Sequence, residues 1–305
     1  MLFSVIIPTF NRVHFLHRAL ASVWAQRFTD FEAIVVDDGS TDGTGEYLRT
    51  LENKTRVVSQ PNLGPGAARN NGALQAQGEY VAFLDSDDVW FPWTLNAFAE
   101  AISKYNQPEV LGGSFVEFVH QVELEKVHEE PHQSLWFPDY LASSQYPYYV
   151  GSGTCVLRRK TLLSIKFLED RLNGEDHDLI LRMGTHSGFA RILEPTTLGW
   201  RRHPASETAD LDRMVSGTSR LVERERSGAY PGGAARARER RRILTRHTRA
   251  VTMGCLQHGL RRDAWKLYQS TLPWNIALAR TKYLAGFPLL AFFSRYLGVP
   301  PRPSS

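Results

Sequence analysis

Two clusters of acidic side chains follow short apolar runs early in this 305-residue chain. The first cluster is DDGS at residues 37–40, and the second is DSDD at residues 85–88. Carboxylates this close raise each other's energy unless a cation or a hydrogen-bonded ligand compensates them. Helix capping by Asp, Ser or Thr explains one Asp in each cluster and leaves the others unexplained. The sequence therefore favours a bound cation or polar ligand near these residues.

The second cluster has the composition of a divalent metal site. Asp85 and Asp87 are two residues apart in an extended segment, so their side chains point the same way, and Asp88 follows where the chain turns. Carboxylates with no thiol or imidazole beside them suit a hard ion such as Mg²⁺ or Mn²⁺, which also takes phosphate oxygens as ligands. A calcium loop is the alternative, but this spacing lacks the Gly and the distal Glu of an EF-hand. We expect Mn²⁺ or Mg²⁺ together with a diphosphate-bearing substrate.

The elements that must position these clusters alternate between strand and helix. Short apolar runs at 3–7, 32–36, 55–59 and 80–84 predict strands, and helical spacing follows each at 13–26, 44–51, 67–76 and 92–104. Continuously apolar strands separated by helices indicate a mostly parallel sheet covered on both faces. Ligands bind at the carboxyl ends of such strands. Residues 8–11 and both acidic clusters therefore belong at one edge of the sheet.

Four strings along these elements resemble glycosyltransferase family 2, a large inverting family with the GT-A fold. They are SVIIPTFNR at 4–12, IVVDDGSTD at 34–42, GPGAARNNGA at 64–73 and GEYVAFLDSDD at 78–88. Each string alone is weak, but four in this order are highly specific. Weaker matches at 174–176 and 202–204 extend the resemblance to about two thirds of the chain. It implies an α/β fold with a Rossmann-like, mostly parallel sheet flanked by helices.

The resemblance also implies a nucleotide pocket. Pro8 and Thr9 would lie along the nucleoside through their backbone, and Phe10 could stack on the base. Asp38 would accept the imide N–H of a uracil, and Arg69 would lie near the base or the phosphates. Two alternatives remain open, because an aromatic at a strand end is often part of the core and Arg69 could lie on a helix surface.

The catalytic base is implied at Asp176, six residues before Arg182 on a helix that opens near residue 173. Inverting transfer needs one base on the acceptor side, positioned for in-line attack at the anomeric carbon. Glu175 would position the acceptor or bind a loop, and a helix cap is the alternative role for Asp176. Some relatives use a His at the position of His203 as a further metal ligand, although a lone loop His is often simply exposed.

The remaining segments are less specific. Residues 111–119 and 122–127 predict two strands of the acceptor half, residues 151–154 are expected close to the sugar, and aromatic residues gather between 136 and 149. A breaker-rich linker at 227–233 precedes an Arg-rich helical segment at 234–257. Helical signals return at 263–270 and at 276–297, interrupted near Pro288. Basic and aromatic residues there suit contact with an anionic membrane surface or with a lipid-linked acceptor. The alternatives are a helical appendage packed on the catalytic domain and a dimer contact.

Composition excludes several classes of protein. The chain has 36 Lys and Arg against 32 Asp and Glu, a net charge of +4 and only two cysteines, which excludes a disulfide scaffold and gives no general nucleic-acid surface. No basic segment precedes the apolar start and no cleavage site follows it, which argues against a signal peptide. No apolar stretch approaches the roughly 20 residues that cross a bilayer. We expect a cytoplasmic protein, either free or peripheral on the cytoplasmic membrane face.

We therefore expect three parts: a nucleotide-sugar-binding half at 1–105, an acceptor-binding and catalytic-base half at 106–210, and a helical extension at 211–305. The predicted enzyme is a hexosyltransferase of polysaccharide biosynthesis that moves a sugar from a nucleotide diphosphate, UDP for preference, to a glycan or lipid-linked acceptor. A sugar-nucleotide pyrophosphorylase is one alternative, but it would need a Gly-rich phosphate loop where residues 8–11 stand. A non-catalytic nucleotide- or glycan-binding module is the other, favoured by loss of Asp87 or Asp176, and both are present.

Overall fold

The structure, a computed structural model, describes residues 1–51, 55–204, 206 and 209–293. The chain divides into two compact units. The first contains residues 1–140, 149–171 and 175–204, and the second contains residues 141–148, 172–174 and 205–305. Both predicted halves, 1–105 and 106–210, supply strands to the first unit, and the predicted extension 211–305 falls within the second.

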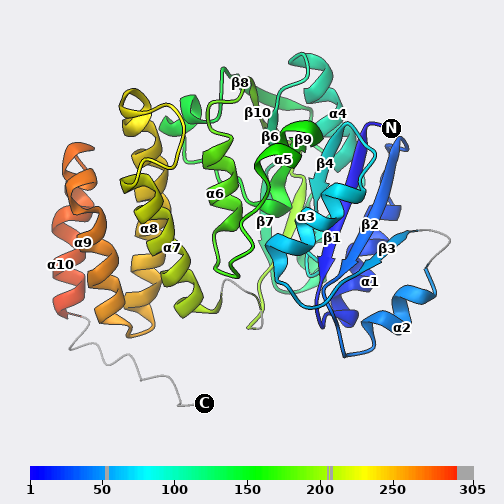
Figure 1. Cartoon of the computed structure of the whole chain (residues 1–305), viewed down its shortest axis with the longest axis horizontal. Helices are drawn as coiled ribbons and strands as arrows, with labels where there is room; N and C mark the ends of the chain where they lie inside the picture. The colour runs from blue at the N-terminus through cyan, green and yellow to red at the C-terminus, as the bar shows by residue number, and fades with distance from the viewer. Residues whose placement is uncertain (52–54, 205, 207–208, 294–305) are drawn as a thin grey trace. The chain divides into compact units, whose positions relative to one another are not determined.

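The first unit is built on an eight-stranded sheet with the order β3-β2-β1-β4-β9-β6-β10-β8 (Figure 1). Strands β1, β2, β3 and β4 pair in parallel, as do β6 and β10, whereas β9 and β8 are antiparallel to their neighbours. The predicted mostly parallel sheet is therefore confirmed. The strands are β1 (Phe3–Thr9), β2 (Phe31–Asp37), β3 (Arg56–Ser59), β4 (Tyr80–Phe83), β6 (Val110–Gly112), β8 (Gln133–Phe137), β9 (Cys155–Arg158) and β10 (Phe189–Glu194).

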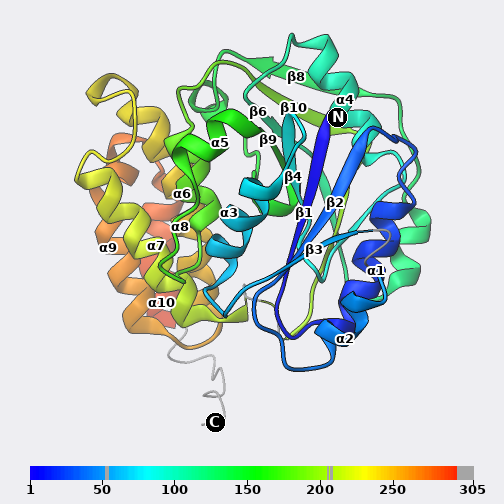
Figure 2. The same cartoon turned by 45° about the vertical axis from the view of Figure 1, so that its right-hand side comes forward.

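Helices cover both faces of this sheet (Figure 2), which explains why strand β1 is buried along its whole length and mostly apolar. Val5 and Ile7 of β1 join a core cluster with Leu16 of helix α1, while Ile6 faces α3 so closely that a Cβ on Gly72 would lie 2.5 Å from it. Burial of alternate side chains on opposite faces requires a continuous apolar run. The helices of this unit are α1 (Val13–Trp24), α2 (Thr44–Arg49), α3 (Pro65–Gln75), α4 (Thr94–Lys104), α5 (Arg159–Ile165) and α6 (Glu175–Arg182).

The segment predicted as two strands at 111–119 and 122–127 differs from that prediction. The first run divides between β6 of the main sheet and β7 (Phe115–Phe118), which joins β11 (Leu198–Arg201) and β5 (Val89–Trp90) in a small second sheet. The prediction of a second strand at 122–127 is wrong, because Gln121–Lys126 forms a 3₁₀ helix. Glu123 Oε1 accepts a hydrogen bond from the backbone N–H of His120 at 2.7 Å. This capping favours a helical turn over an extended strand.

The second unit contains four helices among its described residues: α7 (Leu211–Arg226), α8 (Ala237–Gln257), α9 (Arg261–Ala277) and α10 (Thr281–Phe293). The predicted helical segments at 234–257 and 263–270 and the linker at 227–233 agree with these bounds. The segment predicted at 276–297 begins within α9 and crosses the break between α9 and α10, and α7 was not predicted. The predicted interruption near Pro288 is not observed, and residues 294–297 of that helix lie outside the described part. Proline leaves the carbonyl four residues earlier without its helical donor, and Tyr268 Oη donates to that carbonyl, of Leu284, at 3.0 Å.

Two further observations concern the cysteines and the helices. Cys155 and Cys255 are both buried and free. No helix in the described part of the chain combines the length and apolar character that crossing a bilayer requires.

Candidate active site

Three strands bring the predicted site residues to one edge of the sheet. Thr9, at the end of β1, is in register with Asp37, at the end of β2, and the Asp38 backbone N–H donates to the Thr9 carbonyl at 2.9 Å. Asp85 follows β4, which pairs with the other side of β1. The two acidic clusters and residues 8–11 therefore share the carboxyl edge of the parallel strands, as the sequence predicts.

Asp38 is committed to the loop that leads into α3. Its buried carboxylate accepts hydrogen bonds from Gln60 Nε2 at 2.7 Å and from the backbone N–H groups of Leu63 and Gly64, both at 2.8 Å. Gly39 turns the chain after it with φ +81°, and a Cβ there would lie 2.9 Å from the Asn62 backbone nitrogen. A carboxylate accepts about four hydrogen bonds, so Asp38 keeps one direction for a ligand.

The end of β1 offers one exposed ring and one buried hydroxyl. Phe10 is 42% exposed, so it is not a core residue, which was the alternative to base stacking. Pro8 and Thr9 are buried, and Thr9 Oγ1 has no hydrogen-bond partner among the described residues. A buried hydroxyl without a partner is uncommon. This strand end therefore has free capacity to contact a ligand.

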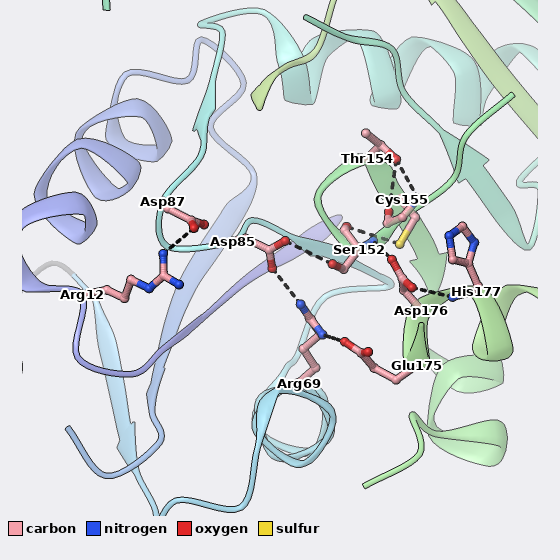
Figure 3. Close-up of polar contacts among 11 residues, drawn as sticks. Arg12, Arg69, Asp85, Asp87, Ser152, Thr154, Cys155, Glu175, Asp176 and His177 are labelled. Atoms are coloured by element: carbon pink, nitrogen blue, oxygen red, sulfur yellow. Dashed lines mark hydrogen bonds and ion pairs between the residues drawn. The ribbon is translucent and has the colours of Figure 1, made fainter. Parts of the chain in front are cut away.

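Arg69 is the centre of a buried ion-pair network (Figure 3). Its Nη2 donates to Asp85 Oδ1 at 2.8 Å, and its Nη1 donates to Glu175 Oε1 at 2.6 Å. Burial alone would lower the pKa of Arg69, but the charges of Asp85 and Glu175 more than offset it and raise the pKa. Arg69 is therefore buried, and the alternative that it lies on the surface of a helix is wrong. Glu175, expected to position an acceptor or a loop, pairs with Arg69.

Replacing Arg69 with Met is expected to lower the free energy of unfolding by about 3 kcal/mol or more, because it leaves two carboxylates facing each other without a counter-charge. Urea denaturation of wild type and variant measures this loss. Glu175→Gln, which keeps a hydrogen-bond acceptor for Arg69, is the control and should lose less. A loss below about 1 kcal/mol in Arg69→Met would contradict a structural role for the pair.

Asp176 lies in the first turn of α6, where two backbone groups orient its carboxylate. Its Oδ2 accepts from the Ser152 N–H at 3.3 Å, and its Oδ1 accepts from the His177 N–H at 2.6 Å. The Ser152 hydroxyl donates to Asp85 Oδ2 at 3.3 Å. Ser152 therefore bridges the carboxylate after β4 and the carboxylate of α6 (Figure 3). The sequence placed residues 151–154 near the sugar but gave no sign of this bridge.

Aromatic side chains border the same carboxylate. Tyr149 stacks on Trp200 with ring centroids 5.9 Å apart and presents an edge to His177 at 5.5 Å. Burial raises the pKa of Tyr149, and the nearby charge of Asp176 raises it further. His177 therefore packs against a half-buried ring. This side of the site combines a carboxylate with flat apolar surfaces.

A second group joins Asp87 to His203. Asp87 Oδ2 lies 2.9 Å from His203 Nε2 and accepts from Arg12 Nη1 at 2.6 Å, and that guanidinium nitrogen is 3.1 Å from the same imidazole nitrogen. One imidazole nitrogen cannot donate to Asp87 and accept from Arg12 at once. Two predicted metal ligands, 116 residues apart, thus converge on one point, and a cationic side chain lies there. Arg12 was not among the predicted site residues.

The other two predicted ligands point elsewhere. Asp85 is held by Arg69 and Ser152, while Asp88 is buried and its Oδ1 accepts from the Arg201 N–H at 2.8 Å. Burial, together with the charges of Asp87 and Asp85, raises the pKa of Asp88 well above its usual range. Within residues 1–51, 55–204, 206 and 209–293, no three His, Cys, Asp or Glu side chains form a group able to hold a metal ion. The predicted set of four metal ligands remains a prediction. The structure brings together only Asp87 and His203 of this set.

An eight-stranded mixed sheet with acidic clusters at the carboxyl edge of its parallel strands is the arrangement that the predicted GT-A fold requires. The family described as "Glycosyl transferase family 2" matches residues 4–165. Since this match covers more than half of the chain, the chain belongs to that family. The predicted family is therefore confirmed.

Curated relatives match a segment of the chain. An uncharacterized glycosyltransferase of Nostoc sp. is 44% identical over 104 residues, covering 33% of this chain and 32% of the relative. The succinoglycan biosynthesis protein ExoW of Rhizobium meliloti is 46% identical over 103 residues, covering 31% and 32%. The chain thus spans about a third of the length of these curated relatives.

Solved structures share the fold over nearly all of the chain. Staphylococcus aureus TarS 1–349 in complex with UDP-GlcNAc has a TM-score of 0.69 at 23% identity, covering 97% of this chain and 88% of that one. The mannosyltransferase PcManGT of Pyrobaculum calidifontis, in complex with GDP-Man and Mn²⁺, has a TM-score of 0.55 at 20% identity, covering 97% and 84%.

Proposed function

We propose that this chain is an inverting glycosyltransferase that moves a sugar from a nucleotide diphosphate sugar, UDP-linked for preference, to a glycan or lipid-linked acceptor. The observation that carries the proposal is the bridge from Asp85 through Ser152 to Asp176. It holds an acceptor-side carboxylate beside the edge of the sheet where a sugar nucleotide would bind. Inverting transfer needs this arrangement, because the base and the leaving group must flank the anomeric carbon.

The donor pocket consists of residues at the ends of β1 and β2. Phe10 offers an exposed ring for stacking on the base, and Asp38 keeps one free acceptor direction for a uracil N–H. Pro8 and Thr9 supply backbone beside the nucleoside. The fold shared with TarS, which was solved with UDP-GlcNAc, supports uridine as the preferred nucleoside. Arg69 acts indirectly, because its guanidinium already holds Asp85 in place.

The metal site is proposed around Asp87 and His203, the two predicted ligands that the fold brings together. Asp85 and Asp88 would join them only by leaving their present partners, Arg69 and the Arg201 N–H. Carboxylate oxygens with one imidazole are a suitable donor set for Mn²⁺, and oxygen ligands alone suit Mg²⁺. Arg12 contacts both Asp87 and His203, and this cationic side chain supports a site that accepts positive charge. The fold-related PcManGT was solved with Mn²⁺. When bound, the ion would offset the charge that develops on the departing diphosphate.

Asp176 is proposed to take the proton from the attacking acceptor hydroxyl. The acceptor oxygen bonds to the anomeric carbon on the face opposite the diphosphate, the bond to the nucleotide breaks, and the proton stays on Asp176. The Ser152 and His177 N–H groups fix the carboxylate for this step. The stacked rings of Tyr149 and Trp200 supply a surface for a sugar acceptor, and ExoW, named for succinoglycan biosynthesis, supports a polymeric glycan.

Calorimetric titration with UDP-, GDP-, dTDP- and ADP-linked sugars, with and without Mn²⁺, tests the proposed donor class. One nucleotide class should bind at least about tenfold more tightly with the metal, because the ion neutralises the diphosphate beside acidic side chains. UDP sugars are expected to be that class. Failure of every sugar nucleotide to bind would contradict the proposed function. Tight binding of a class other than UDP sugars would contradict only the proposed preference for uridine.

A further inference from the structure

The excess of basic over acidic residues in this chain lies in its helical C-terminal part. Residues 210–305 contain 18 Lys and Arg against 6 Asp and Glu, whereas residues 1–209 contain 18 against 26. The modest net charge of +4 conceals this separation. Charge of one sign gathered in one part of a chain creates a local potential that attracts an oppositely charged partner.

Part of this charge lines an open groove of about 900 Å³ in the second unit. Its basic lining residues are Arg226, Arg261, Arg262 and Lys266, and none of the described residues that line it is Asp or Glu. Arg262 and Lys266 are exposed, and neither forms an ion pair with any described residue. The groove therefore offers two exposed cations toward solvent.

The exposed side of α10 is apolar beside this groove. Phe287 and Ala291 on one side of α10 are buried, yet Leu289, Leu290 and Phe293 on the other side are 58%, 50% and 54% exposed. Helices that are apolar on all sides are normally buried. With 13 residues, α10 is shorter than the roughly 20 that span a bilayer. Its outer face therefore suits shallow burial.

The groove and the apolar face form one surface. Arg261, at the start of α9, donates through Nη2 to the carbonyl of Ala291 near the end of α10. Phe292, 54% exposed, lines the groove directly. The start of α9 and the end of α10 lie at the same end of the helical unit (Figure 1). Cations and exposed rings or aliphatic side chains are thus neighbours.

We infer that this surface binds the face of a bilayer that contains anionic lipids. Lipid phosphates would pair with Arg262 and Lys266, and Leu289, Leu290 and Phe293 would enter the boundary between headgroups and acyl chains. A free phosphate would occupy the groove but leave the apolar face in water. The inference is independent of the proposed transfer reaction, because none of these residues belongs to the candidate active site.

Co-sedimentation of the full chain with vesicles tests this inference. Vesicles of phosphatidylcholine alone and with phosphatidylglycerol are compared at about 0.1 M and about 0.5 M NaCl. Wild type should pellet with anionic vesicles at low salt, with a partition coefficient at least tenfold lower on neutral vesicles or at high salt. R262E/K266E and L289S/F293S should each reduce partitioning at least tenfold, because lipid charge and shallow burial are both required.

The matched control is K160E/R238E, which makes the same change in net charge. Lys160 lies on α5 and Arg238 lies in the first turn of α8; neither residue lines the groove, and both are exposed. The control should partition within about twofold of wild type, and all variants should keep the wild-type circular dichroism. Equal pelleting with both lipids, no pelleting with either, or equal losses in control and groove variants would overturn the inference. So would a dimer in sedimentation velocity that L289S/F293S dissociates, without vesicle binding.

Discussion

Asp176→Asn is expected to reduce sugar transfer by about 10²–10⁴-fold while leaving nucleotide affinity within about twofold of wild type. Asparagine has nearly the same shape, and its single side-chain oxygen can keep the 2.6 Å hydrogen bond from the His177 N–H. Its amide nitrogen cannot accept from the Ser152 N–H, and the side chain cannot take a proton from an acceptor. Calorimetry of nucleotide binding and a transfer assay, run on the same preparation, separate the two effects.

Glu175→Gln is the control for this prediction. Glu175 is the neighbouring carboxylate of α6, but its Oε1 is occupied by Arg69 at 2.6 Å. The Gln variant should retain far more transfer than Asp176→Asn. Near-normal transfer by Asp176→Asn, with loss of transfer in a folded Glu175→Gln, would move the base to Glu175.

Asp87→Asn should lower Mn²⁺ affinity at least tenfold and abolish most turnover, because it removes the carboxylate that converges with His203. Electron paramagnetic resonance of free Mn²⁺ measures the affinity without any substrate. Chelation of the wild type should likewise stop turnover, and added Mn²⁺ or Mg²⁺ should restore it. Turnover that persists in excess chelator would contradict metal assistance.

Arg12→Gln is the matched comparison, because it changes the other side of the same contact. Removing the guanidinium that donates to Asp87 at 2.6 Å should leave Mn²⁺ affinity equal to or above that of wild type. Both variants should unfold at wild-type denaturant concentrations. If Asp87→Asn fails to fold while Mn²⁺ does not bind the wild type, the Asp87 cluster has a structural role only.

The residues at the edge of the sheet could be predicted because the first four strands and the helices after them each have a clear local sequence pattern. Each of the first four strands is an apolar run, and each site motif follows directly on a strand or opens a helix, so their common edge follows from parallel pairing. The contacts across the site were not predictable in this way. Arg69 and Glu175 are 106 residues apart, and Asp85 and Ser152 are 67 apart. Only the folded chain brings such partners together.

Helix α7 was missed for a different physical reason. Its sequence is largely polar and includes Gly217, which normally weakens a helix. In the fold, a Cβ on Gly217 would lie 1.8 Å from the carbonyl oxygen of Asn173, so this glycine permits a close approach. Asp210 caps the helix by accepting from the Arg213 N–H at 3.1 Å. Tertiary packing here outweighs local helix propensity.

Release of nucleoside diphosphate from a sugar nucleotide tests the central claim most directly. The purified chain, incubated with its best-bound sugar nucleotide, Mn²⁺ and a panel of glycan and lipid-linked acceptors, should release nucleoside diphosphate without added pyrophosphate or sugar phosphate. The release should depend on the acceptor and fall at least a hundredfold in Asp176→Asn, within the range of general-base effects. Nucleotide binding without any release would indicate a binding module, and turnover that requires pyrophosphate would indicate a pyrophosphorylase; either result would contradict the proposed glycosyl transfer.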